Sequence, residues 1–230
     1  MELEEFTKPI DLKINHKQAT FDLSDESHPY HLESSFSAII IAGVKQRLMW
    51  PPYDSDPNAR RSPLCKSNDN VTGYPQRDFP WEDERAKVVE PKMSGRLSCS
   101  ECEFKDDPQH WKNQGKPVCE SGYKLVLLDA EDRLIIFNAM NMAAKRVIAH
   151  YGEWFKNNKL PTFCYVTKFE LHGVKKSANR YADLELTKQE QTNRNLWVPK
   201  YLPLHDEWKA VLEVPPSPIG GRQTVDLPVL

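Results

Sequence analysis

The sequence predicts a mainly β fold with one or two helices (α+β), interrupted by a loop module that cysteines hold together. Four stretches after residue 120 have the apolar content or the alternation typical of strands, and one stretch carries apolar residues at helical spacing. Residues 51–120 have few apolar runs, yet they contain four of the five cysteines. Together these observations favour a sheet with one inserted, metal-stapled module.

The length and charge of the chain narrow its class. Its 230 residues suffice for one medium domain, and 31 Lys and Arg stand against 33 Asp and Glu, which excludes a histone-like cation. No apolar run reaches the roughly 18 residues of a membrane helix, and the acidic N-terminus is unlike a secretory signal. We therefore expect a soluble, cytoplasmic protein without a membrane partner.

The first half of the chain predicts one strand followed by the module. Residues 1–35 are polar and are expected to form an N-terminal arm, in which the alternation of Ile10, Leu12 and Ile14 predicts one short strand. Residues 36–50 predict a strand, bent at Gly43, because they are apolar and β-branched until Pro51 ends the run. Residues 51–120, rich in Pro, Asp, Asn and Ser, predict a loop-dominated module inserted into the core.

The second half predicts two hairpins with a helix between them. Strands are expected over 123–128 and 134–137, and again over 162–172 and 180–186. Asn138 is the expected N-cap of an amphipathic helix of about 18 residues.

This order of elements suggests a barrel. Four or five antiparallel strands with one helix between the later hairpins, over a core of residues 36–198, are compatible with an OB-like antiparallel barrel. A small α+β sheet would give the same order. A further helix is expected near 188–197, and the Pro-rich residues 199–230 are expected to form an extended tail around a short helix at 205–213.

The cysteines carry the most specific signal. An odd number of cysteines without a signal peptide argues against a disulfide framework. Cys99 and Cys102 form a C-x2-C knuckle, and Cys65 and Cys119 lie in turn-rich sequence of the same module. Two thiolates on a tight turn and two more from nearby turns would complete a tetrahedral structural Zn2+ site.

Other roles for these cysteines remain open at this point. The thiols could be free, or the knuckle could be a redox pair, and His110 is the main rival for a ligand position. Cys164 lies within a predicted strand and is expected to pack in a core. A closed set of four thiolates would give the metal a structural role, because a catalytic zinc keeps an open position.

The sequence contains no enzyme signature. There is no P-loop, no G-x-G-x-x-G after a strand, no G-x-S-x-G and no H-E-x-x-H. The carboxylates that could hold a second metal for a nuclease, Asp54, Asp56, Asp69 and Asp129, form no recognisable cluster. We therefore expect a non-enzymatic protein.

Basic and aromatic residues alternate around the module. Residues 45–77 hold six basic and three acidic side chains. Cations neutralise phosphates and exposed rings stack on bases, the combination typical of single-strand binding. The candidate contacts are Lys45, Arg47, Trp50, Tyr53, Arg60, Arg61, Lys66, Arg77, Trp81 and Trp111, with Trp50 and Arg47 first, and a second cluster of Lys168, Lys175, Lys176, Arg180 and Tyr181. A solvated face with aromatics that fill the module is the alternative.

A resemblance favours the nucleic-acid interpretation. Residues 47–50 (RLMW), 62–69 (SPLCKSND), 99–102 (CSEC) and 116–119 (KPVC), followed by a Leu-rich strand ending at Asp129, resemble a family of phage and mobile-element zinc proteins. Members of that family are described as single-stranded-DNA-binding-like, with an OB-type core interrupted by a four-cysteine module. The likeness covers roughly residues 43–187, and its specific part is the cysteines with the CKSND stretch.

The resemblance implies zinc at Cys65, Cys99, Cys102 and Cys119 and a role in replication or recombination. The hypothesis is a non-catalytic single-stranded-DNA-binding protein of a phage or mobile element, acting in the host cytoplasm. Its expected partners are single-stranded DNA, replication or recombination proteins and further copies of itself. The alternative is a zinc-stabilised interaction module that binds a host protein. Salt dependence separates the two, because phosphate contacts weaken with ionic strength.

Overall fold

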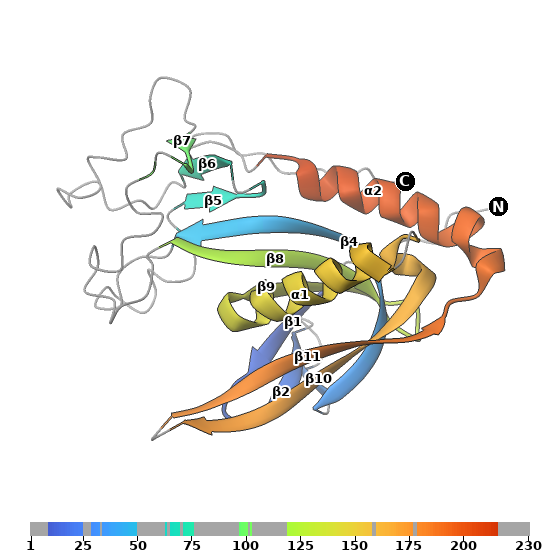
Figure 1. Cartoon of the computed structure of the whole chain (residues 1–230), viewed down its shortest axis with the longest axis horizontal. Coiled ribbons are helices and arrows are strands. Elements are labelled where there is room, and N and C mark those ends of the chain that lie inside the picture. The colour runs from blue at the N-terminus through green and yellow to red at the C-terminus, as the bar shows by residue number, and fades with distance from the viewer. Residues whose placement is uncertain are drawn as a thin grey trace. The chain divides into compact units, whose positions relative to one another are not determined.

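The computed structural model of the chain describes residues 9–24, 29–32, 34–49, 63, 65–69, 71–75, 97–100, 102, 119–157, 160–176 and 179–215 (Figure 1). The chain divides into two compact units, unit 1 with residues 1–44 and 123–212 and unit 2 with residues 45–122 and 213–230. The fold is mainly β with two α-helices and a strongly curled sheet, as the sequence predicts at this level. Among the described residues, no helix is both long and apolar enough to cross a bilayer.

The strands and helices have the following bounds. The strands are β1 (Ile10–Asn15), β2 (Thr20–Ser24), β3 (Pro29–Leu32), β4 (Ser35–Met49), β5 (Cys65–Ser67), β6 (Thr72–Pro75), β7 (Leu97–Ser98), β8 (Cys119–Leu128), β9 (Leu134–Met140), β10 (Tyr165–Lys176) and β11 (Asn179–Gln191). The α-helices are α1 (Asn141–Asn157) and α2 (Leu202–Glu213). Short helical turns at Thr162–Cys164, Arg194–Leu196 and Trp197–Tyr201 complete the elements.

The long strand β4 organises the sheet of unit 1. The strand order runs β3-β2-β1-β9-β8-β4, and the first half of β4 also pairs with β10, from Val166 opposite Ile39 to Glu170 opposite Ser35. Strand β11 then pairs with β10 as an antiparallel hairpin. One pair departs from the predicted antiparallel arrangement, because β1 runs parallel to β9.

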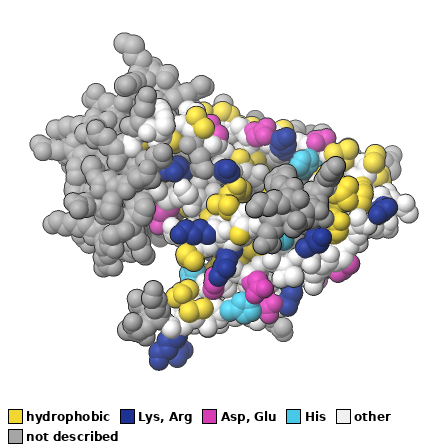
Figure 2. All heavy atoms as spheres, viewed as in Figure 1, with side chains coloured by type: hydrophobic (Ala, Val, Ile, Leu, Met, Phe, Trp, Pro, Cys, Tyr) yellow, Lys and Arg dark blue, Asp and Glu magenta, His cyan; other side chains and the backbone are white. Residues whose placement is uncertain are grey.

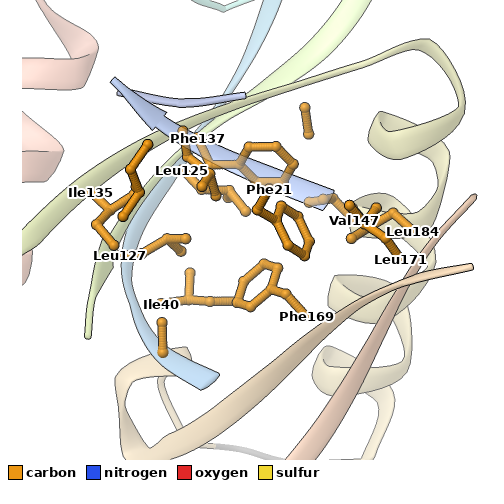
Figure 3. Close-up of a cluster of buried hydrophobic side chains, with 14 of the residues drawn as sticks. Phe21, Ile40, Leu125, Leu127, Ile135, Phe137, Val147, Phe169, Leu171 and Leu184 are labelled. Atoms are coloured by element: carbon orange, nitrogen blue, oxygen red, sulfur yellow. The ribbon is translucent and has the colours of Figure 1, made fainter. Parts of the chain in front are cut away.

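The central strands are buried on both faces, which explains their continuous apolar runs. Along β8, Leu125 and Leu127 point into one hydrophobic core, called core 1 here. Val126 and Leu128 point into a second core, core 2, on the opposite face of the sheet. Core 1 lies inside the curl of the sheet, with Val147 of α1 packed into it (Figure 3). The two cores fix the register of these strands, since a slip of one residue would exchange the faces.

Aromatic rings fill the centre of core 1. The ring of Phe36 stacks on Phe169 at 4.9 Å between centroids and meets the edge of Phe21 at 4.8 Å. Phe137 contacts Phe169 edge-on at 6.2 Å. These residues come from β2, β4, β9 and β10, so the ring cluster ties the hairpins to the central strands.

Helix α2 closes core 2, and it begins three residues before the short helix that the sequence predicts at 205–213. Tyr201, Leu204 and Leu212 are buried there, and the imidazole Nδ1 of His205 lies 2.6 Å from the carbonyl oxygen of Ile41. Leu204 and Leu212 lie eight residues apart and so share one helix face. The sequence does not indicate the earlier start of the helix, because Pro203 lies there, in the first turn, where proline is tolerated.

Three other segments differ from the sequence-based expectation. Residues 1–35 contain the expected short strand as β1, but β2 and β3 follow it, and β1 and β2 bury Leu12, Phe21 and Leu23 in core 1. Helix α1 begins at Asn141 rather than after Asn138, since β9 continues to Met140. Strand β11 extends to Gln191, so a 3-10 turn and a π-helical turn replace the helix expected near 188–197.

Candidate metal centre and nucleic-acid interface

The four predicted zinc ligands lie on neighbouring elements of unit 2. Cys65 begins β5, where it is opposite Met49 of β4 on one side and Pro75 of β6 on the other. Cys99 directly follows β7, and its backbone N–H donates a hydrogen bond of 2.8 Å to the carbonyl oxygen of Val71. Cys119 begins β8, the other neighbour of β4 in the sheet.

The four thiols are close enough to influence one another electrostatically. Burial raises the pKa of the Cys65 thiol, and the charges on Cys119, Cys99 and Cys102 raise it further. Burial also raises the pKa of Cys119 to about 11. None of the five cysteines, all of them described, forms a disulfide. In the part of the chain that the structure describes, no three His, Cys, Asp or Glu side chains have the spacing of ligands around one metal ion.

Asp69 builds the turn on which part of this cluster depends. Its Oδ1 accepts hydrogen bonds from the backbone N–H of Val71 and of Thr72, both at 2.7 Å, and from Ser67 Oγ at 2.9 Å. The backbone N–H donors of Thr72 and Val71 and the Ser67 hydroxyl lower the pKa of this carboxyl group. The turn fixes Val71, whose carbonyl oxygen accepts from Cys99. The CKSND stretch thus has a structural role next to its cysteine.

Arg47 lies in the cysteine cluster. A hydrogen bond and the positive charge of its guanidinium oppose the rise in the pKa of Cys119. Its Nε is buried and has no hydrogen-bond partner among the described residues. The sequence ranks Arg47 among the first DNA contacts, whereas the structure places its guanidinium beside a predicted zinc ligand.

Most of the other predicted contacts around the module lie outside the described residues: Trp50, Tyr53, Arg60, Arg61, Arg77, Trp81 and Trp111, and with them the rival ligand His110. Of the remaining two, Lys45 is exposed on β4 and Lys66 is half-buried on β5. The structure therefore brings together the cysteines with Arg47, Lys45 and Lys66 in unit 2.

The second predicted cluster lies on the β10–β11 hairpin of unit 1. Lys175 is directly opposite Arg180 in the strand register, and both side chains are exposed. Val174 is opposite Tyr181, and Lys176 is opposite Asn179. Figure 2 shows Lys and Arg side chains at the projecting end of this hairpin. Like charges directly opposite each other destabilise a strand pair unless an anion compensates them.

Several other charges along the hairpin are paired. Lys168 Nζ lies 2.7 Å from Glu170 Oε2, and His172 Nε2 lies 3.0 Å from Glu185 Oε2. Arg146 of α1 forms a bidentate ion pair with Asp183 of β11. By contrast, neither Lys175 nor Arg180 forms an ion pair with a described residue. Of the predicted cluster, Lys168 is thus paired with Glu170, whereas Lys175 and Arg180 have no ion pair among the described residues.

A cleft next to this hairpin was not predicted. It has a volume of about 450 Å³ and lies between β1, the junction of β9 with α1, and β11. Tyr181 is its one lining residue that the sequence predicts as a nucleic-acid contact. The other polar residues lie in a segment assigned to the arm or at a helix boundary placed two residues too early. The pairing of β1 with β9 creates the cleft, and no local sequence pattern indicates that pairing.

No protein-family model, no curated protein and no solved structure matches the chain.

Proposed function

We propose that the protein binds single-stranded DNA without catalysing a reaction, through an OB-type core that carries a zinc-stapled module. The observation that supports this most strongly is the pairing of β4 with both β8 and β10. This pairing is compatible with an OB-type barrel, whose first strand pairs with the second and the fourth and whose helix connects the third to the fourth. Strands β4, β8, β9, β10 and β11, with α1 after β9, follow this order. The described part of the chain differs from that barrel in one respect, since β9 pairs with β1 and not with β11.

The OB correspondence assigns functions to two connections. In OB folds, the loops between the first and second strands and between the fourth and fifth strands contact oligonucleotides. Here the first of these connections is residues 50–118, which hold most of the predicted basic and aromatic contacts. The second is the end of the β10–β11 hairpin, next to Lys175 and Arg180. Both predicted clusters therefore fall where such a fold binds a strand.

The outer face of the second and third strands is covered in this protein. Val126, Leu128, Leu134 and Ile136 of β8 and β9 pack in core 2 under α2. This aliphatic face offers neither rings nor cations for a strand. We therefore assign DNA contact to the two loop regions rather than to that face.

The hairpin end suits a phosphate. Lys175 and Arg180 repel each other across the strands, and a phosphate between them would relieve that repulsion while gaining two charge-assisted contacts. Tyr181, half-buried beside Arg180, provides a ring on which a base can stack.

The zinc proposal rests on the convergence of the four thiols. Cys65, Cys99, Cys102 and Cys119 would hold one Zn2+, and the Asp69 turn already holds Val71 and Cys99 together. Zinc would connect β5, the β7 turn and β8 through metal–thiolate bonds. It would so stabilise the module without a catalytic role. Four thiolates and Zn2+ carry a net charge of −2, which Arg47 would partly offset.

The test is the binding of zinc-loaded protein to fluorescein-labelled oligo(dT), followed by anisotropy at several salt concentrations. In the double variant Lys175→Glu/Arg180→Glu, two lost phosphate contacts should reduce the log–log salt slope by about 1.4 and weaken binding at low salt. The control Lys145→Glu/Lys209→Glu makes the same change in net charge at exposed positions on α1 and α2. Equal losses in the two variants, or no binding by the wild type, would contradict the proposal.

One observation favours the alternative, a module that binds a host protein. Val198, Leu202 and Val211 are exposed at 72%, 40% and 36% around α2, and exposed apolar side chains suit a protein partner. This function becomes the first candidate if the folded, zinc-loaded protein fails to bind DNA at low salt. The resemblance of the cysteine motifs suggests replication or recombination of a phage or mobile element as the context for either function.

A further inference from the structure

The cleft between β1, β11 and the β9–α1 junction has the size and lining of a ligand site. Its volume of about 450 Å³ lies within the range of about 300–1,000 Å³ that is typical of small-molecule sites. All of its lining residues belong to unit 1. The N–H of Ala182 donates a hydrogen bond of 3.3 Å to His16 Nδ1, which fixes the turn after β1 against β11.

The floor of the cleft is apolar. Leu12 and Ala182 are buried core residues at its base, and Ile14, Met140 and Ala143 are partly buried beside them. A flat apolar ligand face would displace water from these side chains, which is favourable. The floor therefore suits a ring system rather than a small ion.

Two amides stand at one side of the cleft. Asn138 and Asn141 flank Met140, and each side chain can donate and accept hydrogen bonds. Asn141 has a φ of 52°, a left-handed conformation that Asn tolerates better than most residues, at the point where β9 ends and α1 begins. Amides that donate and accept side by side can read the edge of a nucleobase.

The lining of the cleft also includes a cation, a carboxylate and an aromatic ring, from Lys13, Asp11 and Tyr181. Lys13 of β1 is exposed at the cleft, where its ammonium group can reach a phosphate. Because His16 Nδ1 accepts a hydrogen bond, the neutral ring carries its proton on Nε2 as a second donor. Tyr181 follows Arg180 directly, so the cleft adjoins the cationic end of the hairpin.

We propose that this cleft binds a nucleotide, with the base over the apolar floor and against the two amides and the phosphate towards Lys13. This inference rests on the proposed function, because it takes the nucleotide to be one residue of the bound DNA strand. A free nucleotide offers the same chemistry, and the experiment separates the two sources.

The experiment uses the full zinc-loaded chain and two kinds of probe. Binding of dAMP, dCMP, dGMP and dTMP is measured by ligand-observed NMR, and oligo(dT) and oligo(dA) binding by anisotropy. Asn141→Gly removes the amide but keeps a residue that adopts a positive φ without strain, so the junction should stay folded. Loss of the amide contact should raise the Kd of at least one mononucleotide by about fivefold or more.

A charge reversal provides an independent variant. Lys13→Glu should weaken mononucleotide binding, whereas Lys17→Glu should not, because Lys17 is exposed in the turn after β1 and does not line the cleft. Both changes are at exposed positions, so neither should disturb the fold, which circular dichroism checks.

The outcomes keep the two proposals apart. Weaker mononucleotide and oligonucleotide binding by Asn141→Gly and Lys13→Glu supports a strand nucleotide in the cleft. Mononucleotide binding without oligonucleotide binding supports a free-nucleotide site and contradicts the proposed function. Oligonucleotide binding that neither variant weakens, together with no mononucleotide binding, overturns this inference and leaves the proposed function standing.

Discussion

Replacing Gly43 by alanine should destabilise the protein, because β4 passes closest to its neighbours at this residue. A Cβ atom added there would lie 2.7 Å from Leu125 Cδ2 of β8 and 2.9 Å from the Tyr151 hydroxyl oxygen of α1. Both distances are shorter than real Cβ contacts, so at least one neighbour must move. The glycine thus permits the close approach of β4 and α1 inside the curled sheet.

The cost follows from how firmly the two neighbours are held. Leu125 is fully buried in core 1, and the ring of Tyr151 stacks on Tyr123 at 6.0 Å between centroids. Forcing an extra methyl group into such packing costs about 1–3 kcal/mol. Each kcal/mol lowers the midpoint of thermal unfolding by about 2–4 °C in a chain of this length. Removing the tyrosine oxygen with Tyr151→Phe should recover part of the loss in the Gly43→Ala background.

A second glycine provides the control. Gly152 lies in α1, and an added Cβ would meet no atom within 4 Å. Gly152→Ala should therefore stabilise the protein by about 0.5–1 kcal/mol, since glycine inside a helix is entropically unfavourable. The assay is urea unfolding followed by far-UV circular dichroism in zinc-containing buffer. A Gly43→Ala variant as stable as the wild type would refute the packing described at β4.

Three further predictions address an ion pair, the cysteine cluster and α2. Hydrogen bonds from Arg146 lower the pKa of Asp183, so the stability that this pair contributes is present above the unfolded pKa of about 4 and is lost as the pH falls through the lowered value. Asp183→Asn should flatten the acid limb of an unfolding-against-pH series, and an unchanged limb would contradict the assignment. Arg47→Ala should raise the Kd for zinc by about 10–100-fold in competition with a chromophoric chelator, and an unchanged Kd would show that its charge does not act on the cluster. Leu204→Ala should cost about 2–5 kcal/mol in urea unfolding, whereas the exposed Leu202→Ala should stay within about 0.5 kcal/mol, and similar losses would refute the packing of α2.

The central strands could be predicted from the sequence because their burial leaves a local trace. Residues 125–128 and 134–137 are apolar without interruption, since alternate side chains fill core 1 and core 2. Strand β1 leaves a weaker trace. Only Leu12 is fully buried in it, and its parallel pairing with β9 joins residues more than 120 positions apart. Local patterns cannot indicate such a pairing.

The candidate sites could be predicted only where a local pattern in the sequence indicates them. Spacing identifies Cys99 and Cys102, and composition identifies the cations of the last hairpin. The register that puts Lys175 opposite Arg180 depends on the length of the connecting turn, which the sequence does not determine. The sequence predicts Arg47 as a DNA contact, because nothing local indicates that the fold brings its guanidinium to Cys119.

The central claim is that the protein binds single-stranded DNA by contacting the phosphates of the strand, and one salt series tests it most directly. Zinc-loaded protein is titrated with labelled oligo(dT) from low to moderate ionic strength. The account predicts a Kd of about a micromolar or tighter at low salt, with a log–log slope that steepens by about −0.7 for each phosphate contact. No binding by the folded protein, or an affinity that does not change with salt, would contradict it.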